Sequence, residues 1–363
     1  MNRSSRPARI HVRNQAMTRS DESLNAFEAE ERLWHEYLEA YRHPPRDFAG
    51  GFRPLGGFIA DFTVVWHEQR MHMFHIDRRL GETECAWPGH EIFIGHASTG
   101  DLVSWEVHDP VLLIRPGTWE GCHVGAPYIQ PHDGRYVMAY QGINEAGSQN
   151  LGLAFSDDLF EWKRSPHNPI SPLAQAEWAF WRSDGTASCR DAHLNFVDDR
   201  FWLNFTACTR EGGTCIAMAS SSDLVTWNDH GPIIDGGSDR NADDESAPFH
   251  HVHHIESSAL IPHEGHWLLF GIDRDGIHYW ESPTMDRFDY AQGKPLWKDV
   301  GPGEVAWRDG SRWLMCACHY EDGYGVPGSV LRFGEIDWSD AEPEVRMITG
   351  ESRIADWVRR IKT

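Results

Sequence analysis

The sequence lacks any apolar run that approaches the roughly 20 residues needed to cross a membrane. Its basic N-terminus, with Arg3, Arg6, Arg9 and Arg13, is not followed by the apolar segment of a secretory signal. We therefore expect a cytoplasmic protein that has no membrane partner.

Positive charge is also scarce in this chain. It carries 33 Lys and Arg against 55 Asp and Glu, which gives a formal net charge of −22. A protein with this balance repels a polyanion at long range rather than attracting it. Nucleic acid is therefore not an expected partner.

Patterns that would hold a metal or a nucleotide are missing as well. The seven cysteines include no pair of C-x-x-C clusters, and their odd number leaves at least one unpaired. The pairs Gly212-Gly213 and Gly236-Gly237 do not precede a helix with the Lys and Ser/Thr of a phosphate loop. We expect free thiols, no structural zinc, and neither ATP nor NAD as a cofactor.

What the sequence does contain is one segment repeated five times. Each copy is a polar turn, a basic residue and then an alternating apolar strand. The residues that end the five turns are Arg70, Arg135, Arg200, His266 and Arg312. The intervals between these residues are 65, 65, 66 and 46, which is a period typical of a repeat architecture.

A second motif runs in phase with the first and ends in Trp105, Trp162 and Trp227. Together the two motifs give about four strands per repeat, the unit of a propeller blade. We predict an all-β fold, a five-bladed β-propeller over residues 46–345, with a short N-terminal helical extension at 21–45. Residues 1–20 are expected to form a disordered tail and residues 346–363 a C-terminal tail.

Acidic residues recur at the start of the predicted inner strands. Asp61 and Asp191 lie nine residues before the end of their turns, Glu256 lies ten before and Glu304 eight before. Inner strands begin near the propeller axis, so we expect these side chains to meet at one mouth of the channel. A carboxylate beside an apolar run is costly to bury unless it is paired or used. For any single one of these acidic residues, the alternative is that its side chain only caps a turn.

Crowded carboxylates suit glycoside hydrolysis. Like charges push pKa values apart, so that one carboxyl stays protonated while another stays ionised. The protonated group can give its proton to the leaving oxygen, while the ionised group attacks the anomeric carbon or activates water. We therefore predict Asp61, Asp191 and Glu256 as the catalytic residues.

At these residues the sequence resembles the five-bladed propeller glycoside hydrolases of families 32, 68 and 43. Arg190-Asp191 is similar to the Arg-Asp of the R-D-P motif of family 32, and the segment from Gly95 to Trp105 is similar to the one that closes blade one there. The resemblance implies that Asp61 is the nucleophile or base, Asp191 the transition-state stabiliser, Glu256 the proton donor and Arg190 a ligand of sugar hydroxyls. Ala192 stands in place of the motif's proline.

Further side chains are predicted to contact the substrate. His123 and Glu120 lie just upstream of the equivalent position in the second repeat, Glu304 occupies it in the fifth, and Trp181 could stack on a sugar ring. His254 ends the run His250–His254, which could hydrogen-bond a sugar or hold a divalent metal. A solvated entrance loop is favoured over a metal site for that run, and core packing is an equal alternative for Trp181.

The expected function is therefore hydrolysis of a furanoside-type or short oligosaccharide substrate, either β-fructofuranosidase-like or arabinofuranosidase-like. Two alternatives stay open at this point. One is a glycoside phosphorylase, which would need cationic side chains in the channel, and the other is a non-catalytic sugar-binding propeller.

Overall fold

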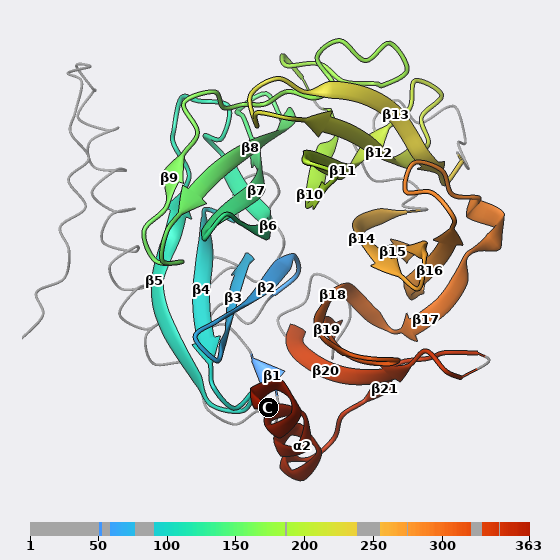
Figure 1. The fold of residues 1–363 in the computed structure, drawn as a ribbon. Coiled ribbons are helices and arrows are strands. Elements are labelled where there is room, and N and C mark those ends of the chain that lie inside the picture. The colour runs from blue at the N-terminus through green and yellow to red at the C-terminus, as the bar shows by residue number, and fades with distance from the viewer. Residues whose placement is uncertain are drawn as a thin grey trace, which may run out of the picture.

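Five antiparallel sheets are arranged radially around one axis in the computed structural model (Figure 1). The structure describes residues 51–52, 59–76, 91–185, 187–237, 255–273, 275–320, 329–340 and 342–363. The predicted all-β, five-bladed β-propeller is confirmed. The predicted tail at 1–20 and helix at 21–45 lie outside the described residues.

Each of the first four blades is a meander of four strands in chain order. Blade one contains β2 (Phe62–His67), β3 (Arg70–Ile76), β4 (Phe93–Thr99) and β5 (Trp105–Leu113). Blade two contains β6 (His123–His132), β7 (Arg135–Ile143), β8 (Gln149–Ser156) and β9 (Lys163–Arg164). Blade three contains β10 (Cys189–Val197), β11 (Arg200–Cys208), β12 (Thr214–Ser221) and β13 (Asn228–Asp235). Blade four contains β14 (Glu256–His263), β15 (His266–Asp273), β16 (Gly276–Ser282) and β17 (Lys294–Lys298), with the short 3-10 helix η1 (Tyr290–Gln292) before β17.

Blade five draws on both ends of the described chain. Its strands are β18 (Val300–Asp309), β19 (Arg312–Tyr320) and β20 (Ser329–Asp337), and the outer edge of β20 pairs with β1 (Gly51–Phe52) and β21 (Arg346–Met347). A Cβ atom on Gly51 would lie 2.6 Å from the carbonyl oxygen of Leu331, so glycine permits this close pairing. The ring is thereby closed by a strand that precedes blade one.

The two sequence motifs correspond to two kinds of turn. The second strand of each blade begins at the predicted turn-ending residue, from Arg70 in β3 to Arg312 in β19. The second motif forms a turn at the end of the third strand, as in blade two, where Ser156 Oγ accepts from the N–H of Leu159 at 2.8 Å. In the same turn Asp158 accepts from the N–H groups of Phe160 and Glu161. The motif is therefore a structural signature of the propeller.

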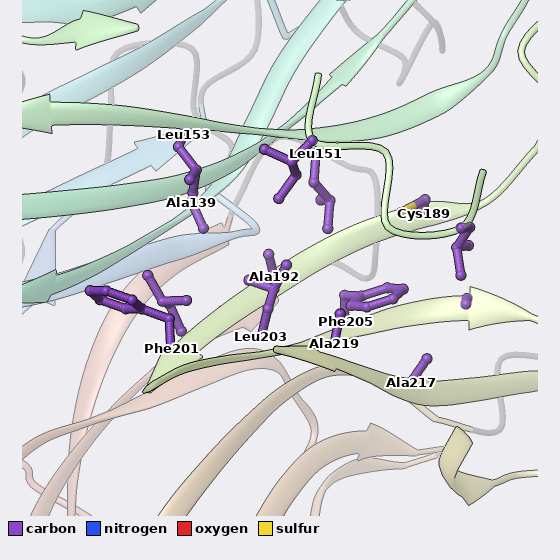
Figure 2. Close-up of a cluster of buried hydrophobic side chains, with 14 of the residues drawn as sticks. Ala139, Leu151, Leu153, Cys189, Ala192, Phe201, Leu203, Phe205, Ala217 and Ala219 are labelled. Carbon is purple, nitrogen blue, oxygen red and sulfur yellow. The ribbon is translucent and has the colours of Figure 1, made fainter. Parts of the chain in front are cut away.

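Apolar side chains from neighbouring blades fill the spaces between the sheets. Figure 2 shows Leu151 and Leu153 of blade two close to Leu203 and Phe205 of blade three, in one buried cluster. Full burial of side chains of this size contributes about 1.5–3 kcal/mol each. This packing holds the inner strands in place around the channel.

Residues 346–363, which we expected to form a tail, contain β21 and the helix α2 (Glu351–Lys362). Ile354 and Trp357 of the helix are buried against the cluster that contains Phe333 of blade five. No helix among the described residues is long and apolar enough to span a membrane.

Candidate active site

The inner strands of blades two, three and four share an irregularity close to their first residues. The pairing register shifts after Gly125 in β6, after Arg190 in β10 and after Glu256 in β14. The residue that follows each of these has a positive φ, which is 41° at Ala126, 55° at Asp191 and 51° at Ser257. Such bulges bend a strand and redirect its side chains, and a non-glycine residue in this conformation costs about 1 kcal/mol or more.

The shared bulge shows that Asp191 and Glu256 do not occupy equivalent positions in their blades. Asp191 occupies the left-handed position, which Ser257 holds in blade four, whereas Glu256 corresponds to Arg190. The acids of blades three and four are therefore one residue apart in the repeat. They still approach each other, because consecutive residues of a bulge can both point towards the channel.

Arg190 joins the acids of blades three and four. Its Nη2 donates to Oε2 of Glu256 at 2.7 Å, and its Nε lies 3.2 Å from Oδ2 of Asp191. The side chains of Arg190 and Asp191 are buried, while that of Glu256 keeps 25% of its surface exposed. The guanidinium therefore holds two carboxylates of neighbouring blades together, and Glu256 is the more accessible of the two.

Ser257 links this cluster to Asp61. Its N–H donates to Oδ2 of Asp191 at 3.3 Å, and its hydroxyl lies 3.5 Å from Oδ1 of Asp61. Asp61 comes directly before β2, and its carbonyl accepts from the N–H of Ile76 at 3.0 Å. The three predicted acids thus lie together. They come from the start of the inner strands β2, β10 and β14, which lie around the central axis (Figure 1).

Burial and neighbouring negative charges shift the pKa values of Asp61 and Asp191. Burial raises the pKa of Asp61 well above its usual value, and the charges of Asp191, Glu91 and Glu256 raise it further against the opposing effect of Arg190. Burial also raises the pKa of Asp191, although Arg190 opposes this shift. Because these groups interact, their protons belong to the cluster as a whole. The site can therefore keep one carboxyl protonated beside an ionised one.

A small cavity of about 50 Å³ opens beside these acids. Asp61 and Asp191 line it together with Tyr128 and His193, whose ring centroids are 3.8 Å apart. Burial lowers the pKa of His193 to about 3, so its imidazole is neutral at pH 7. The cavity wall thus combines carboxylates with a neutral aromatic surface, which suits an uncharged polar ligand such as a sugar.

Glu304 also lines this cavity, as its predicted position at the channel requires. Its Oε1 accepts from the hydroxyl of Thr63 at 3.0 Å, and its Oε2 accepts from the N–H of Val64 at 2.6 Å. Burial raises its pKa to about 8. Glu304 therefore connects blade five to blade one, with both carboxylate oxygens already engaged.

His123 is buried, does not line this cavity, and contacts a residue that the sequence did not indicate. Its Nε2 is 3.0 Å from Oε2 of Glu91, and both side chains are buried. Gln141 approaches the same ring nitrogen at 3.0 Å. Glu91 stands outside both repeated motifs, so no signal in the sequence marked it.

Glu120 and Trp181 occupy other places than the predicted one. The carboxylate of Glu120 is 1% exposed, pairs with Nε of Arg164 at 2.9 Å and accepts from the hydroxyl of Tyr140. The prediction that Glu120 contacts substrate is corrected, because these partners enclose it within blade two. Trp181 packs against the core between blades two and three, and its Nε1 donates to the carbonyl of Gln149 at 2.8 Å.

The remaining predicted residue, His254, lies outside the described residues. Within the described ranges no three His, Cys, Asp or Glu side chains are grouped so as to hold a metal ion. Six cysteines fall in these ranges, and no disulfide joins any two of them.

Known proteins resemble this chain in sequence and in fold. The β-fructofuranosidase insoluble isoenzyme 6 of Oryza sativa subsp. japonica is 31% identical over 161 residues, which are 43% of this chain and 26% of that protein. The chain thus spans about a quarter of the length of this relative. The structure of the family 32 β-fructofuranosidase BmSUC1 of Bombyx mori superposes with a TM-score of 0.63 at 16% identity, over 92% of this chain and 71% of that one. A thermostable family-43 glycoside hydrolase superposes with a TM-score of 0.59 at 16% identity, over 85% of this chain and 96% of that one.

The two structural likenesses establish the propeller fold, and a family match goes further. Residues 52–254 match the family described as glycosyl hydrolases family 32 N-terminal domain. This range contains β2 to β13, and with them the Arg190-Asp191 pair, and it also includes Asp61. Since it includes more than half of the 363 residues, the chain belongs to the glycosyl hydrolases family 32 N-terminal domain family.

Proposed function

We propose that this protein is a glycoside hydrolase that cleaves a furanosidic bond in a short oligosaccharide, of the β-fructofuranoside or arabinofuranoside class. The observation that carries the proposal is the meeting of Asp61, Asp191 and Glu256 in one cluster, with Arg190 between two of them. Asp61 and Asp191 line the cavity beside this cluster. Family membership and the β-fructofuranosidase among its relatives support it.

Glu256 is proposed as the proton donor. Its side chain is the more exposed of the two that Arg190 holds, so a glycosidic oxygen can approach it. The proton passes to the leaving oxygen while the bond from that oxygen to the anomeric carbon breaks. The bond between Arg190 and Glu256 fixes the orientation of the carboxyl during this step.

Asp61 is proposed to act on the anomeric carbon, either as the nucleophile or as the base that takes a proton from the attacking water. In both cases it must be ionised, and water supplies the hydroxyl that completes the product. Asp191 is held by Arg190 and by the N–H of Ser257, so its carboxylate is fixed in place. There it can stabilise the positive charge that develops on the sugar ring in the transition state.

The cavity favours hydrolysis over the phosphorolytic alternative. A glycoside phosphorylase uses phosphate in place of water and needs cationic side chains to bind this anion. The described residues that line the cavity include no Lys or Arg, and the nearby Arg190 is already bound by two carboxylates. Water is therefore the favoured acceptor.

The test is a hydrolysis screen of the purified protein against fructosides, arabinofuranosides, xylosides and galactosides. Asp61→Asn and Glu256→Gln are measured alongside, with Glu264→Gln in an exposed turn of blade four as the control. We expect furanoside hydrolysis, a loss of about 10²–10⁴ in rate for Glu256→Gln on natural substrates, and no change in the control.

An activated aryl leaving group needs less help from a proton, so Glu256→Gln should recover much of its rate on aryl furanosides. Asp61→Asn should remain inactive on both kinds of substrate. A protein that binds these sugars but hydrolyses none would instead be a binding propeller. The cytoplasmic location expected from the sequence stays a prediction.

A further inference from the structure

One aromatic side chain is exposed in the segment that leads into blade three. Phe180 is 48% exposed, although burial of a ring of this size is favourable. Its two neighbours in the chain are anchored. Ala179 is 4% exposed, and Nε1 of Trp181 donates to the carbonyl of Gln149 at 2.8 Å. The segment therefore holds a large apolar side chain in water at a fixed place.

Backbone pairing with blade three determines where Phe180 lies. Its N–H donates to the carbonyl of Cys208 at 2.9 Å, and Ala179 forms an antiparallel bridge with Thr209. The opposite edge of β11 is paired with β12, so this segment lies on the edge that β10 occupies further along. Phe180 therefore extends the inner edge of blade three beyond the start of β10, at the channel mouth.

The pairing register also determines the direction of the Phe180 side chain. Residues opposite each other in an antiparallel pair point to the same face, and so do residues two apart along a strand. Phe180 lies opposite Cys208, while Arg190 lies opposite Thr206, two residues earlier in β11. Phe180 therefore shares a face with Arg190 and lies roughly 7 Å further towards the mouth, from the rise of a strand.

This face of blade three is directed at blade four and the proposed proton donor. Nη2 of Arg190 donates to Oε2 of Glu256 at 2.7 Å. Oγ1 of Thr206 accepts from the N–H of Ser257 at 3.2 Å. Phe180 thus lies at the outer end of the gap between blades three and four, on the mouth side of the Glu256 carboxyl.

This position corresponds to the leaving group of the substrate. The cavity beside Asp61 and Asp191 is only about 50 Å³, so the rest of an oligosaccharide has to extend towards the mouth. Glu256 is the proposed donor to the oxygen at which the leaving group begins. The first unit of the leaving group therefore passes between Glu256 and the mouth, beside Phe180.

We propose that Phe180 is a specificity-determining residue that stacks on the first sugar unit of the leaving group. The inference rests on the proposed hydrolase function. A sugar ring presents an apolar face of C–H groups, which an aromatic side chain covers. The substrate class is therefore an oligosaccharide whose leaving group is itself a sugar ring, in preference to a glycoside of a small alcohol. Covering about half of a phenyl ring favours such a substrate by about tenfold.

The experiment compares kcat/KM for two substrates that share the furanosyl unit found in the screen and differ in the leaving group. One is a disaccharide with a sugar leaving group, and the other is the methyl furanoside. Phe180→Ala should lower kcat/KM about tenfold on the disaccharide and leave it unchanged on the methyl furanoside, because a methyl group offers no ring to stack. Phe180→Tyr keeps the ring and should retain the wild-type preference.

The measured quantity is the ratio of the two kcat/KM values, which does not depend on the fraction of active protein. Partial misfolding of a variant therefore does not obscure the result. Phe196→Ala is the matched control, because Phe196 is 37% exposed at the far end of β10, where it packs against Phe201. Its ratio should equal that of the wild type.

The wild-type ratio in Phe180→Ala, or the same change in Phe180→Tyr or Phe196→Ala, would overturn the proposal. An equal loss on both substrates would also overturn it, since Phe180 would then only support the fold of the site. Failure of the proposed function looks different, because the wild type would hydrolyse neither substrate, and the role of Phe180 would fall with it.

Discussion

Glu304 provides a measurable test of the contact between blades five and one. Its carboxyl accepts from Thr63 and Val64 of blade one, and burial raises its pKa from the usual 4.5 to about 8. Between these two pH values the folded protein keeps the proton of Glu304 while the unfolded chain loses it. This difference destabilises the folded state progressively as the pH rises.

The size of the effect follows from the shift. Each pH unit between about 4.5 and 8 removes about 1.4 kcal/mol from the free energy of unfolding, so the whole interval removes about 3–5 kcal/mol. Below pH 4.5 the contribution is complete, and above pH 8 it is lost. Glu304→Gln cannot titrate, and its amide oxygen can still accept from the N–H of Val64.

The assay is urea unfolding at pH 5 and pH 9, followed by tryptophan fluorescence. The wild type should lose about 3–5 kcal/mol more than Glu304→Gln between these two conditions. The exposed control Glu264→Gln should follow the wild type. If the stability difference between the wild type and Glu304→Gln changed by less than about 1 kcal/mol, Glu304 would not be held protonated and the reasoning would be refuted.

Three further predictions concern other ionisable side chains. Arg190→Met should lower kcat/KM by about 10²–10³, because it leaves Glu256 and Asp191 without their cation. Arg190→Lys keeps the charge and should retain part of the rate. Equal kcat/KM values for the two variants would contradict the contact of one guanidinium with two carboxylates. Glu120→Gln should lower the free energy of unfolding by about 3–5 kcal/mol, because Arg164 loses its buried partner, and steady-state kinetics per folded molecule should stay unchanged. Burial lowers the pKa of His96 to about 2, so only the unfolded chain gains its proton as the pH falls below 6.5. Between pH 6.5 and 4.5 the free energy of unfolding of His96→Phe should therefore fall by about 2 kcal/mol less than that of the wild type, as measured by urea unfolding. An equal fall in both proteins would contradict a neutral buried His96.

Much of the fold could be predicted because its signals are local. The hairpin turns that precede β3, β7, β11 and β15 contain residues with positive φ, such as Gln69 at 63° and Asp199 at 56°. Short polar residues and glycine are favoured in such turns, so their repetition was visible in the sequence. The helix α2 was missed although a signal existed, since Ile354 and Trp357 recur with helical spacing and both are buried.

The candidate site was predictable to a smaller extent. Counting from the turns found all three acids, and it places Glu256, ten residues before the end of its turn, at the position of Arg190 rather than of Asp191, which the shared bulge confirms. Glu120 was placed at the channel because it precedes β6, whereas its true surroundings depend on Arg164, which is distant in sequence. Glu91 is defined by a similar long-range contact with His123. Pairings of this kind leave no trace in one sequence.

The closure of the ring by β1 has a consequence for the order of events during protein synthesis. Gly51 and Phe52 leave the ribosome about 280 residues before their partners Arg332 and Leu331. Contacts between such distant residues form late in folding because a long loop has to close first. Until β1 and β21 arrive, the outer edge of β20 is an unpaired strand edge, and such edges readily pair with other chains. The last step of folding is therefore also the step at which a nascent chain is most exposed to aggregation.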